Sequence, residues 1–367
     1  MRKQAGVFQK LAARLGMWTL AFGLVLTTSL SSNAEYRIIH SESVQYTDIA
    51  PGVRHELHQF FTEEGWIVVN VVRSKQDASD SVVPLYTKGD LTSPRTLSEF
   101  VKNEKNVVAA INGDYYDYKS EAVLGRLMDR GALVQTSNRD KKHAHVEIGR
   151  DGKIAIGYED GSSVRLLYGG NQRDVAFVNK RYTDWDNILL FDRAFGAKSP
   201  GFGDLRGEGD KTPVVEYRVE KGNVVQMIRN DEEDANGAKE TESVDQLDIP
   251  EGGLAEGNFI IRAQGKYAED MVSTLKVGDT VELLLPKMPY TSISGGAQLV
   301  KDGKVVEAFT HNVYGEHPRT AIGVEKDGKT VLFVTVNGRS SSYRGIRQSE
   351  LAELMVKLGA YQALILD

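Results

Sequence analysis

The residues best suited to chemistry stand where apolar runs of the sequence end. Residues 331–336 form a short run of β-branched and aromatic residues that stops at Asn337, and residues 363–366 form a second run that leads directly into Asp367. A carboxylate can take a proton from water, and an amide can hydrogen-bond a polar ligand. The two side chains can work together only if both runs end at the same place in the fold.

The segment between the two runs has the pattern of a helix. Apolar residues recur there at helical spacing, namely at Leu351, Leu354, Met355 and Leu358. Gly359 follows as a left-handed C-cap. Strand, helix and strand in this order predict a parallel βαβ unit. Its strands would bring Asn337 and Asp367 to one edge of the sheet, about 5 Å apart if the strands are neighbours. Open α/β sheets bind their ligands at such an edge.

Two arginines are predicted near the same edge. Arg319 follows Pro318 and precedes a predicted strand at residues 321–324, and Arg339 follows Asn337 by two positions. A guanidinium group has the fork that matches a phosphate, so both arginines are candidates for a phosphate clamp. The alternative for Arg319 is a surface ion pair worth under about 1 kcal/mol.

Two Asn-Gly pairs follow apolar runs. Residues 107–111 are a third such run, which we expect to be a strand, and Asn112-Gly113 comes directly after it. Asn337-Gly338 ends the run described first. Either pair could be a type I′ hairpin turn, the strongest short-range use of this dipeptide. A tight hairpin cannot follow a strand of a parallel unit, so the predicted topology favours a binding role instead.

Other glycines mark turns or close approaches of the backbone. Gly295-Gly296 is either a β-bulge or a place where the backbone approaches a ligand. Three Asp-Gly turns, at Asp151, Asp302 and Asp327, separate apolar runs and predict β-hairpins, because both central positions of such a turn favour positive φ. Their aspartates are therefore poor catalytic candidates.

No motif of the sequence predicts a metal or a cofactor. His143 and His145 would share one face of a strand, but two histidines with no cysteine and no HExxH motif do not make a zinc site. Dinucleotide-binding, Walker A and nucleophilic-serine motifs do not occur directly after any predicted strand. We therefore expect a site built from side chains alone.

Five motifs occur in an order that is similar to that of a known family. They are Asn-Gly-x-aromatic-aromatic ending at Tyr116, GGxxLVxxGK from Gly295, PRTAIG from Pro318, VxVxGR ending at Arg339, and ELAxLMxxLGAxxALxLD ending at Asp367. Each motif alone is weak, and the ordered set is specific. From about residue 95 to residue 367 the chain resembles the phosphodiester glycosidase family.

The resemblance implies a hydrolase that cleaves a sugar-1-phosphodiester, such as a GlcNAc-1-phosphodiester, at the anomeric carbon. The leaving phosphate has a second pKa near ~6, so it departs without a strong general acid, and one carboxylate with cations for the phosphate replaces the usual pair of carboxylates. The catalytic residues that the resemblance implies are Asp367, Asn337 and Arg319. The implied substrate-binding residues are Asn112, Gly113, Gly295, Gly296, Thr320, Gly338 and Arg339.

The chain departs from the family pattern at three points. Asn337 stands where the family usually has Asp, Ile365 stands where it usually has Asn, and the family's Gly-rich, Ser-containing stretch after Asp367 is absent. Gly-rich turns after a strand present backbone N–H groups to anions. The alternative function is therefore that of a truncated or degenerate saccharide-binding protein of the cell envelope without catalysis. A further alternative is a hydrolase that acts on another exopolysaccharide linkage.

The composition is that of an ordinary globular chain. It has 367 residues, of which 41% are hydrophobic and 26% charged, enough for one large domain or two of moderate size. A net charge of −6 and a pI near 5.8 give no sign of the basic surface that binds nucleic acid. We expect a carbohydrate or sugar-phosphate substrate, no nucleic-acid partner and no cofactor.

Residues 1–34 have the pattern of a secretory signal peptide. Basic residues precede an apolar stretch at residues 17–26, and Ser32, Asn33 and Ala34 supply small residues for cleavage after Ala34. The apolar stretch is shorter than the ~20 residues of a membrane span, which disfavours the alternative of an uncleaved anchor. The chain has no cysteine and hence no disulfides. These features predict a secreted or periplasmic protein with no stable membrane span after cleavage.

The rest of the chain is predicted to have two parts. Residues 35–92 alternate apolar and polar positions and should form an N-terminal β element, and residues 93–367 should form the phosphodiester glycosidase-like domain. The expected fold class is α+β, with a mixed β-sheet core, a C-terminal parallel βαβ unit and the N-terminal β element. Residues 201–246 are rich in Gly and acidic residues, and the run at residues 231–243 should be a solvated loop because it lacks the oxygen spacing of a calcium loop.

Overall fold

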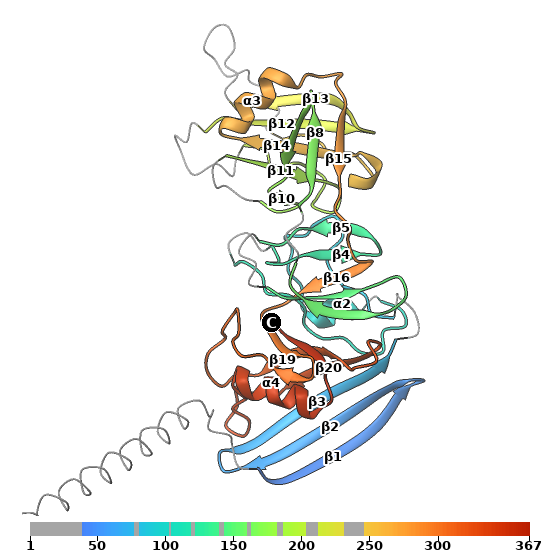
Figure 1. Ribbon diagram of the computed structural model, residues 1–367, viewed down its shortest axis with the longest axis vertical. Coiled ribbons are helices and arrows are strands. Elements are labelled where there is room, and N and C mark those ends of the chain that lie inside the picture. The colour runs from blue at the N-terminus through green and yellow to red at the C-terminus, as the bar shows by residue number, and fades with distance from the viewer. Residues whose placement is uncertain are drawn as a thin grey trace, which may run out of the picture.

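The structure of this protein is a computed structural model (Figure 1). It describes residues 39–76, 81–102, 104–118, 122–138, 143–159, 163–181, 186–202, 212–230 and 246–367. The signal peptide expected at residues 1–34 and the acidic run at residues 231–243 lie outside the described residues.

Three parts are stacked along the long axis of the molecule, and we name them the main sheet, the middle sheet and the upper unit (Figure 1). The main sheet has eight strands in the order β1-β2-β3-β20-β19-β21-β17-β18, and all its neighbouring strands are antiparallel. These strands are β1 (Ile39–Ala50), β2 (Val53–Thr62), β3 (Gly65–Lys75), β17 (Gln298–Lys301), β18 (Lys304–Val305), β19 (Arg319–Val324), β20 (Thr330–Val336) and β21 (Gln362–Leu366).

The middle sheet has the order β5-β4-β16-β6-β7, and the upper unit combines the sheets β10-β11-β14-β12-β13 and β15-β8-β9. The strands of the middle sheet are β4 (Leu127–Asp129), β5 (Ala132–Gln135), β6 (His145–Ile148), β7 (Ile154–Gly157) and β16 (Thr291–Ser294). Those of the upper unit are β8 (Arg165–Tyr168), β9 (Asn171–Asp174), β10 (Phe177–Val178), β11 (Asn187–Phe191), β12 (Val214–Glu220), β13 (Asn223–Arg229), β14 (Phe259–Gln264) and β15 (Val281–Leu284). The helices are α2 (Leu97–Lys102), the 3₁₀ helix η1 (Leu254–Glu256), α3 (Lys266–Thr274) and α4 (Gln348–Lys357).

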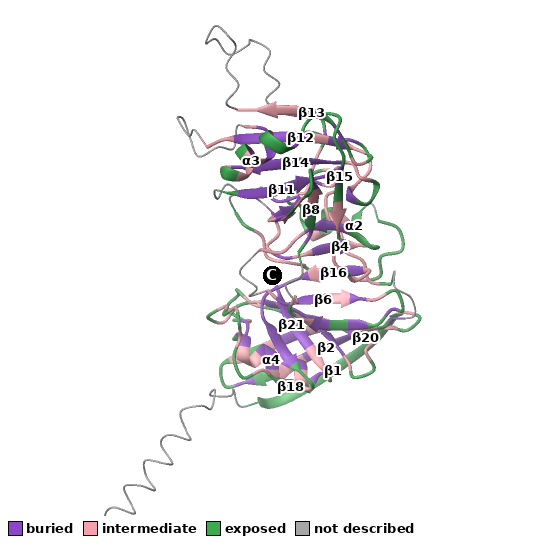
Figure 2. Ribbon diagram, turned by 45° about the horizontal axis from the view of Figure 1, so that its top comes forward, coloured by how far each residue is buried: buried purple, intermediate pink, exposed green. Residues whose placement is uncertain are grey.

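The chain visits these parts as nested insertions. It leaves the main sheet after β3, forms most of the middle sheet and then the upper unit, returns to the middle sheet as β16, and re-enters the main sheet at β17. Segments far apart in the sequence therefore meet where the main and middle sheets join. The C-terminal residue lies at this junction (Figures 1 and 2).

The strands at the centre of the main sheet are buried on both faces because two hydrophobic cores flank them (Figure 2). In β21, Ala363 and Ile365 face the core under α4, and Leu364 and Leu366 face the core shared with β6 and β7. Strand side chains alternate between faces, so a strand covered on both sides reads as one continuous apolar run. This explains why the sequence at residues 363–366 shows no polar alternation.

The predicted C-terminal helix is confirmed, with buried Leu351, Ala352 and Met355 on its sheet-facing side. It ends at Leu358, and Gly359 has φ 94°, as expected for a left-handed C-cap. The three predicted Asp-Gly turns are also confirmed, because they join the hairpins β6–β7, β17–β18 and β19–β20.

The prediction of a parallel βαβ unit with neighbouring strands is not confirmed. β20 and β21 run in the same direction, but β19 lies between them and pairs antiparallel with both. In the described residues, parallel pairing occurs between β10 and β11, far from the C-terminal unit. The α+β class fits loosely, since strands dominate and the main sheet is antiparallel instead of mixed. The N-terminal strands β1–β3 extend this same sheet through the pairing of β3 with β20.

One local prediction was wrong. Residues 107–111 are not a strand, and Val107 and Val108 are exposed, so apolar composition alone misled us there. Residues 212–230, within the segment rich in Gly and acidic residues, form β12 and β13, and β12 lies inside its sheet and is largely buried. Within the part of the chain that the structure describes, no helix is long and apolar enough to span a bilayer.

Candidate active site

The candidate site lies at one edge of the main sheet, where β20 and β21 end and β19 begins. Arg319 pairs with the last residue of β20, and Thr320 pairs with the last residue of β21. Asn337 and Asp367 therefore follow at the same edge on either side of β19, and we call these four residues the site edge. With one strand between them, Asn337 and Asp367 have backbones about 10 Å apart, twice the spacing of neighbouring strands.

The segment at residues 112–115 crosses the end of β21. The Asn112 side chain donates from Nδ2 to the Asp367 carbonyl (3.2 Å), and the Asp367 N–H donates to the Gly113 carbonyl (3.1 Å). The Tyr115 hydroxyl donates to the Leu366 carbonyl (3.1 Å). Neither residue of the Asn112-Gly113 pair has a positive φ, which excludes the type I′ turn. The fold thus brings Asn112 and Gly113 to Asp367.

Asp367 is accessible to solvent on one side. Partial burial raises the pKa of its carboxyl group above the usual value, and the positive charge of Arg339 opposes this rise. A carboxylate with a raised pKa is a better proton acceptor than an ordinary aspartate. The site edge therefore holds one accessible carboxylate next to one arginine.

Arg339 is exposed and has a left-handed backbone, with φ 59°. This conformation costs energy for a residue with a Cβ atom and recurs at functional sites. The preceding Gly338 is packed so closely that a Cβ atom there would lie 2.5 Å from the Pro318 nitrogen. The turn after β20 is therefore fixed by packing against the chain that enters β19, and it holds Arg339 where its charge acts on Asp367.

Asp114 is a buried carboxylic acid that our sequence analysis did not select. Its Oδ2 accepts a hydrogen bond from the Gly125 N–H (2.6 Å), and its Oδ1 is buried without a partner among the described residues. Burial raises the pKa of Asp114 to about 7, the Gly125 N–H and the charge of Lys180 lower it, and the charge of Asp367 raises it further. The available signal was its place directly after Asn112-Gly113 in the first family motif.

An aromatic cluster lies beside the same junction. The His311 ring packs against the Tyr115 ring, with centroids 5.3 Å apart, and against the His143 ring at 5.3 Å. His143 Nδ1 donates to the Gly295 carbonyl (2.9 Å), which fixes the orientation of its imidazole. In the described residues no group of three or more His, Cys, Asp or Glu side chains could hold a metal ion. The sequence analysis weighed His143 as a metal ligand and missed this packing role.

The glycine pair Gly295-Gly296 joins the middle sheet to the main sheet. A Cβ atom at Gly295 would lie 2.5 Å from the Ile365 carbonyl oxygen, and one at Gly296 would lie 2.8 Å from the Ile365 side chain. The Gly296 N–H also donates to the Ile365 carbonyl (2.7 Å). Both glycines are buried, so the close approach that they permit is to β21 and not to an open surface.

Arg319 is buried, and its guanidinium is occupied by main-chain carbonyl groups. Nε donates to Ile346 O (3.0 Å), and Nη2 donates to Val313 O (3.0 Å) and Gly315 O (2.6 Å). Burial lowers the pKa of Arg319. Thr320, the next residue of the strand, faces the opposite side of the sheet because strand side chains alternate. The geometry gives Arg319 a bracing role instead of the phosphate clamp that we expected.

Replacing Arg319 with lysine should therefore lower stability more than it alters chemistry. A lysine cannot reach the three carbonyl groups in the fork geometry of a guanidinium, and a buried acceptor left unpaired costs about 1–3 kcal/mol. We expect Arg319→Lys to lower the free energy of unfolding by about 2 kcal/mol, measured by urea unfolding. The exposed Arg344 offers the matched control, since Arg344→Lys should leave the unfolding midpoint unchanged.

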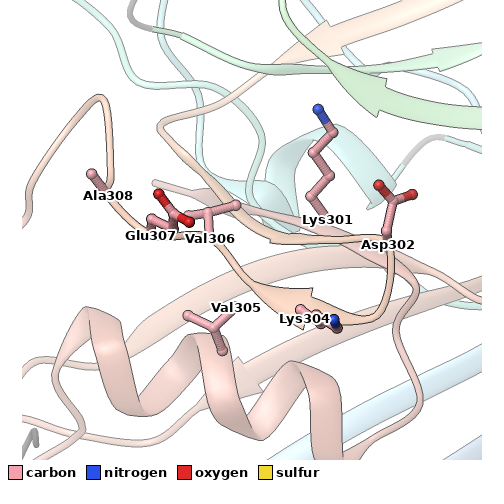
Figure 3. Close-up of a pocket in the computed structure, with 7 residues that line it drawn as sticks. All are labelled: Lys301, Asp302, Lys304, Val305, Val306, Glu307 and Ala308. Atoms are coloured by element: carbon pink, nitrogen blue, oxygen red, sulfur yellow. The ribbon is translucent and has the colours of Figure 1, made fainter.

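A surface hollow of about 660 Å³ lies beside the β17–β18 hairpin (Figure 3). It is lined by Lys301, Asp302, Lys304, Val305, Val306, Glu307 and Ala308. The lining carries charges of both signs and includes none of the residues of the site edge. Because β18 is the outer strand of the main sheet, this hollow is a feature of the sheet margin and is separate from the candidate site.

Comparison with curated sequences shows one short similarity. The chain is 35% identical over 89 residues to the SPbeta prophage-derived uncharacterized protein YomE of Bacillus subtilis (strain 168). The similarity covers 23% of this chain and 14% of that protein, so the chain spans only a small part of this relative.

Solved structures share the fold over most of the chain. A hypothetical protein from Synechocystis superposes with a TM-score of 0.62 at 17% identity, over 89% of this chain and 58% of that one. A candidate exported protein from Burkholderia pseudomallei K96243 superposes with a TM-score of 0.69 at 13% identity, over 91% of this chain and 94% of that one. At these identities the likeness shows the fold alone.

The family model for phosphodiester glycosidase matches residues 211–367. This match is shorter than the resemblance noted in the sequence, since it leaves out the segment at residues 112–116. It includes β19, β20, α4 and β21, and with them all four residues of the site edge. Residues 211–367 of this chain are therefore similar to phosphodiester glycosidases.

Proposed function

We propose that this protein is a hydrolase that cleaves a sugar-1-phosphodiester, of the GlcNAc-1-phosphodiester type, at the anomeric carbon. The observation that carries the proposal is the site edge, where the accessible carboxylate of Asp367 lies in the field of Arg339. The match of residues 211–367 to phosphodiester glycosidases supports the reaction class. Carbohydrate is the substrate class that this family name implies.

In the proposed reaction, a water molecule attacks the anomeric carbon. The bond between that carbon and the phosphate oxygen breaks, its electron pair stays with the phosphate, and the proton of the water passes to Asp367. A phosphomonoester leaves readily because its second pKa is near ~6. The raised pKa of Asp367 suits a group that accepts a proton, and we expect Asn112 and Asn337 to hydrogen-bond sugar hydroxyls.

Asp114 has a positioning role in this proposal. Its Oδ1 atom is out of contact with solvent, so the carboxyl group cannot touch a substrate in this arrangement. Through Gly125 it anchors the segment that follows the first motif, and its neutral form avoids a second negative charge beside Asp367. Below its pKa of about 7, Asp114 therefore adds no charge to the surroundings of Asp367.

The proposal is tested by incubating the full chain with a methyl GlcNAc-1-phosphodiester and measuring the release of methyl phosphate and free sugar. Release of both products in equal amounts supports the hydrolase. Saccharide binding by calorimetry without any turnover would instead support the binding protein that the departures at Asn337 and Ile365 suggest. Turnover of an exopolysaccharide without a phosphodiester would move the substrate to another glycan linkage.

Arg339 is expected to bind the phosphate of the substrate. Arg339→Ala should raise KM for the phosphodiester about 10- to 100-fold, the range for a lost charge-assisted hydrogen bond, and Arg339→Lys should recover part of the loss as a point charge. Arg339→Gly should lose affinity equally but unfold no more easily, because glycine adopts the φ of 59° without cost. An unchanged KM in Arg339→Ala would contradict this role. Arg54, exposed on β2, provides the control substitution Arg54→Ala.

We also propose that the protein is exported. The support is the signal-peptide pattern of residues 1–34 and the description of the structurally similar Burkholderia protein as a candidate exported protein. Intact mass measurement of the chain recovered from the periplasm or medium should give a mature N-terminus at Glu35. Recovery of the full-length chain with cytosolic proteins would refute the proposal.

A further inference from the structure

Tyr314 is a large aromatic residue that the fold holds out in solvent. It is 82% exposed, whereas the two residues that fix its loop, Arg319 and Gln348, are each 5% exposed. A single exposed aromatic residue is ordinary on a protein surface, so exposure alone assigns no role. What distinguishes Tyr314 is the way in which its loop is fixed and the place where the loop lies.

The main chain on both sides of Tyr314 is held by buried side chains. Arg319 Nη2 donates to the carbonyl groups of Val313 (3.0 Å) and Gly315 (2.6 Å), the residues directly before and after it. The Gln348 side chain accepts from the Val313 N–H (2.7 Å). An aromatic side chain on a fixed main chain loses little conformational entropy when it contacts a ligand. Tyr314 is therefore preorganised for a contact.

The same loop borders the site edge at both of its ends. At its start, His311 packs against Tyr115, whose hydroxyl donates to the last residue of β21 (3.1 Å). A further bond from the Gln348 side chain to the His311 carbonyl (3.0 Å) fixes this end. At its other end, the chain enters β19 at Arg319, the first residue of the site edge. The Tyr314 loop is thus continuous with the site at both ends.

We propose that Tyr314 forms a saccharide-stacking subsite beside Asp367, an inference that rests on the proposed function. A tyrosine ring offers an apolar face and one polar tip, which matches a pyranose ring with its apolar C–H face and its hydroxyl edge. The anionic part of the substrate is attracted by Arg339, which lies in the turn after β20. In this arrangement the sugar ring packs on Tyr314, and the phosphate binds Arg339.

The experiment measures binding by calorimetry in the full chain carrying Asp367→Asn, which is expected to slow turnover strongly. The probes are the methyl GlcNAc-1-phosphodiester and inorganic phosphate. In this background Tyr314→Ala should weaken the Kd for the phosphodiester about tenfold, the size expected for a lost aromatic contact, and should leave the Kd for inorganic phosphate unchanged. Tyr314→Phe keeps the ring and should bind within about twofold of the parent.

A matched control is Tyr46→Ala, because Tyr46 is also exposed, at 62%, and lies on β1 at the far margin of the main sheet. It should leave both affinities unchanged. Equal phosphodiester affinity in Tyr314→Ala and its parent would overturn the subsite, and so would a matching loss for inorganic phosphate. If the unsubstituted chain still hydrolyses the phosphodiester in that case, the proposed function stands without the subsite. Absence of both hydrolysis and saccharide binding in the unsubstituted chain would overturn the proposed function, and the subsite with it.

Discussion

An Asp367→Asn variant is expected to lose about 10³-fold in kcat on a sugar-1-phosphodiester, within the range for removal of a general base. The amide cannot accept the proton of the attacking water, and it removes the negative charge that stabilises a developing positive charge on the sugar ring. The main chain should be unaffected, because the contact with Gly113 uses the backbone N–H of Asp367. Single-turnover assays with wild-type and variant chains measure this difference.

Two further measurements make the Asp367 result specific. Asp151 lies in an exposed turn of the middle sheet, and Asp151→Asn should retain full activity. In the wild-type chain, kcat/KM should fall as the pH drops through the raised pKa of Asp367, because protonation removes the acceptor. Retention of more than about a tenth of the activity by Asp367→Asn would exclude this residue as the base.

An Asp114→Asn variant should be more stable than the wild type at pH 8 and similar to it at pH 4. The pKa of Asp114 is raised from 3.8 to about 7 by burial. Between these values the unfolded chain releases the proton and the folded chain keeps it, so rising pH destabilises the folded wild type. This rise in the pKa of Asp114 corresponds to a loss of about 4 kcal/mol in the free energy of unfolding. The asparagine cannot ionise, so the variant does not lose this stability. Urea unfolding of both proteins across this pH range gives the difference directly.

The neighbouring charge supplies a second test of Asp114. Because the charge of Asp367 contributes to the raised pKa of Asp114, Asp367→Asn should lower that pKa, so the loss of stability with rising pH should become smaller and should end at a lower pH. A stability difference between wild type and Asp114→Asn that stays constant from pH 4 to pH 8 would show that Asp114 is not held neutral. Such a result would also remove its proposed positioning role.

Local elements of this protein could be read from its sequence because their determinants are close together in the chain. Residues 331–336 and 363–366 are strands, the spacing of Leu351 and Met355 marks a helix, and Gly359 ends it. Turn and helix signals depend on residues that are close together in the chain, so they can be recognised without knowledge of the fold. The strand prediction for residues 107–111 failed because apolar composition does not fix pairing, and this segment joins none of the sheets that the structure describes.

Strand order could not be read in this way. Two strands joined by a helix are expected to be parallel neighbours, but β19, which precedes both in the sequence, lies between them. Pairing is decided by which faces can be buried together, and the main sheet buries β19, β20 and β21 between the core under α4 and the core shared with β6 and β7. The error in strand order does not separate the residues of the site edge. β20 and β21 still run in the same direction, so Asn337 and Asp367 still lie at the same edge of the main sheet.

The sequence by itself determined which residue types stand at the ends of the strands, and with them the resemblance to phosphodiester glycosidases and the carboxylate Asp367. Only the tertiary structure decided what surrounds them. It buried Asp114 beside Asp367, occupied the guanidinium of Arg319 with three carbonyl groups, and fixed Tyr314 in solvent. Burial and hydrogen-bond partners come from segments distant in the sequence, whereas strand and helix patterns are local. For this reason Asp367 could be selected as the acid from the sequence, whereas its burial and its neighbouring residues depend on the fold.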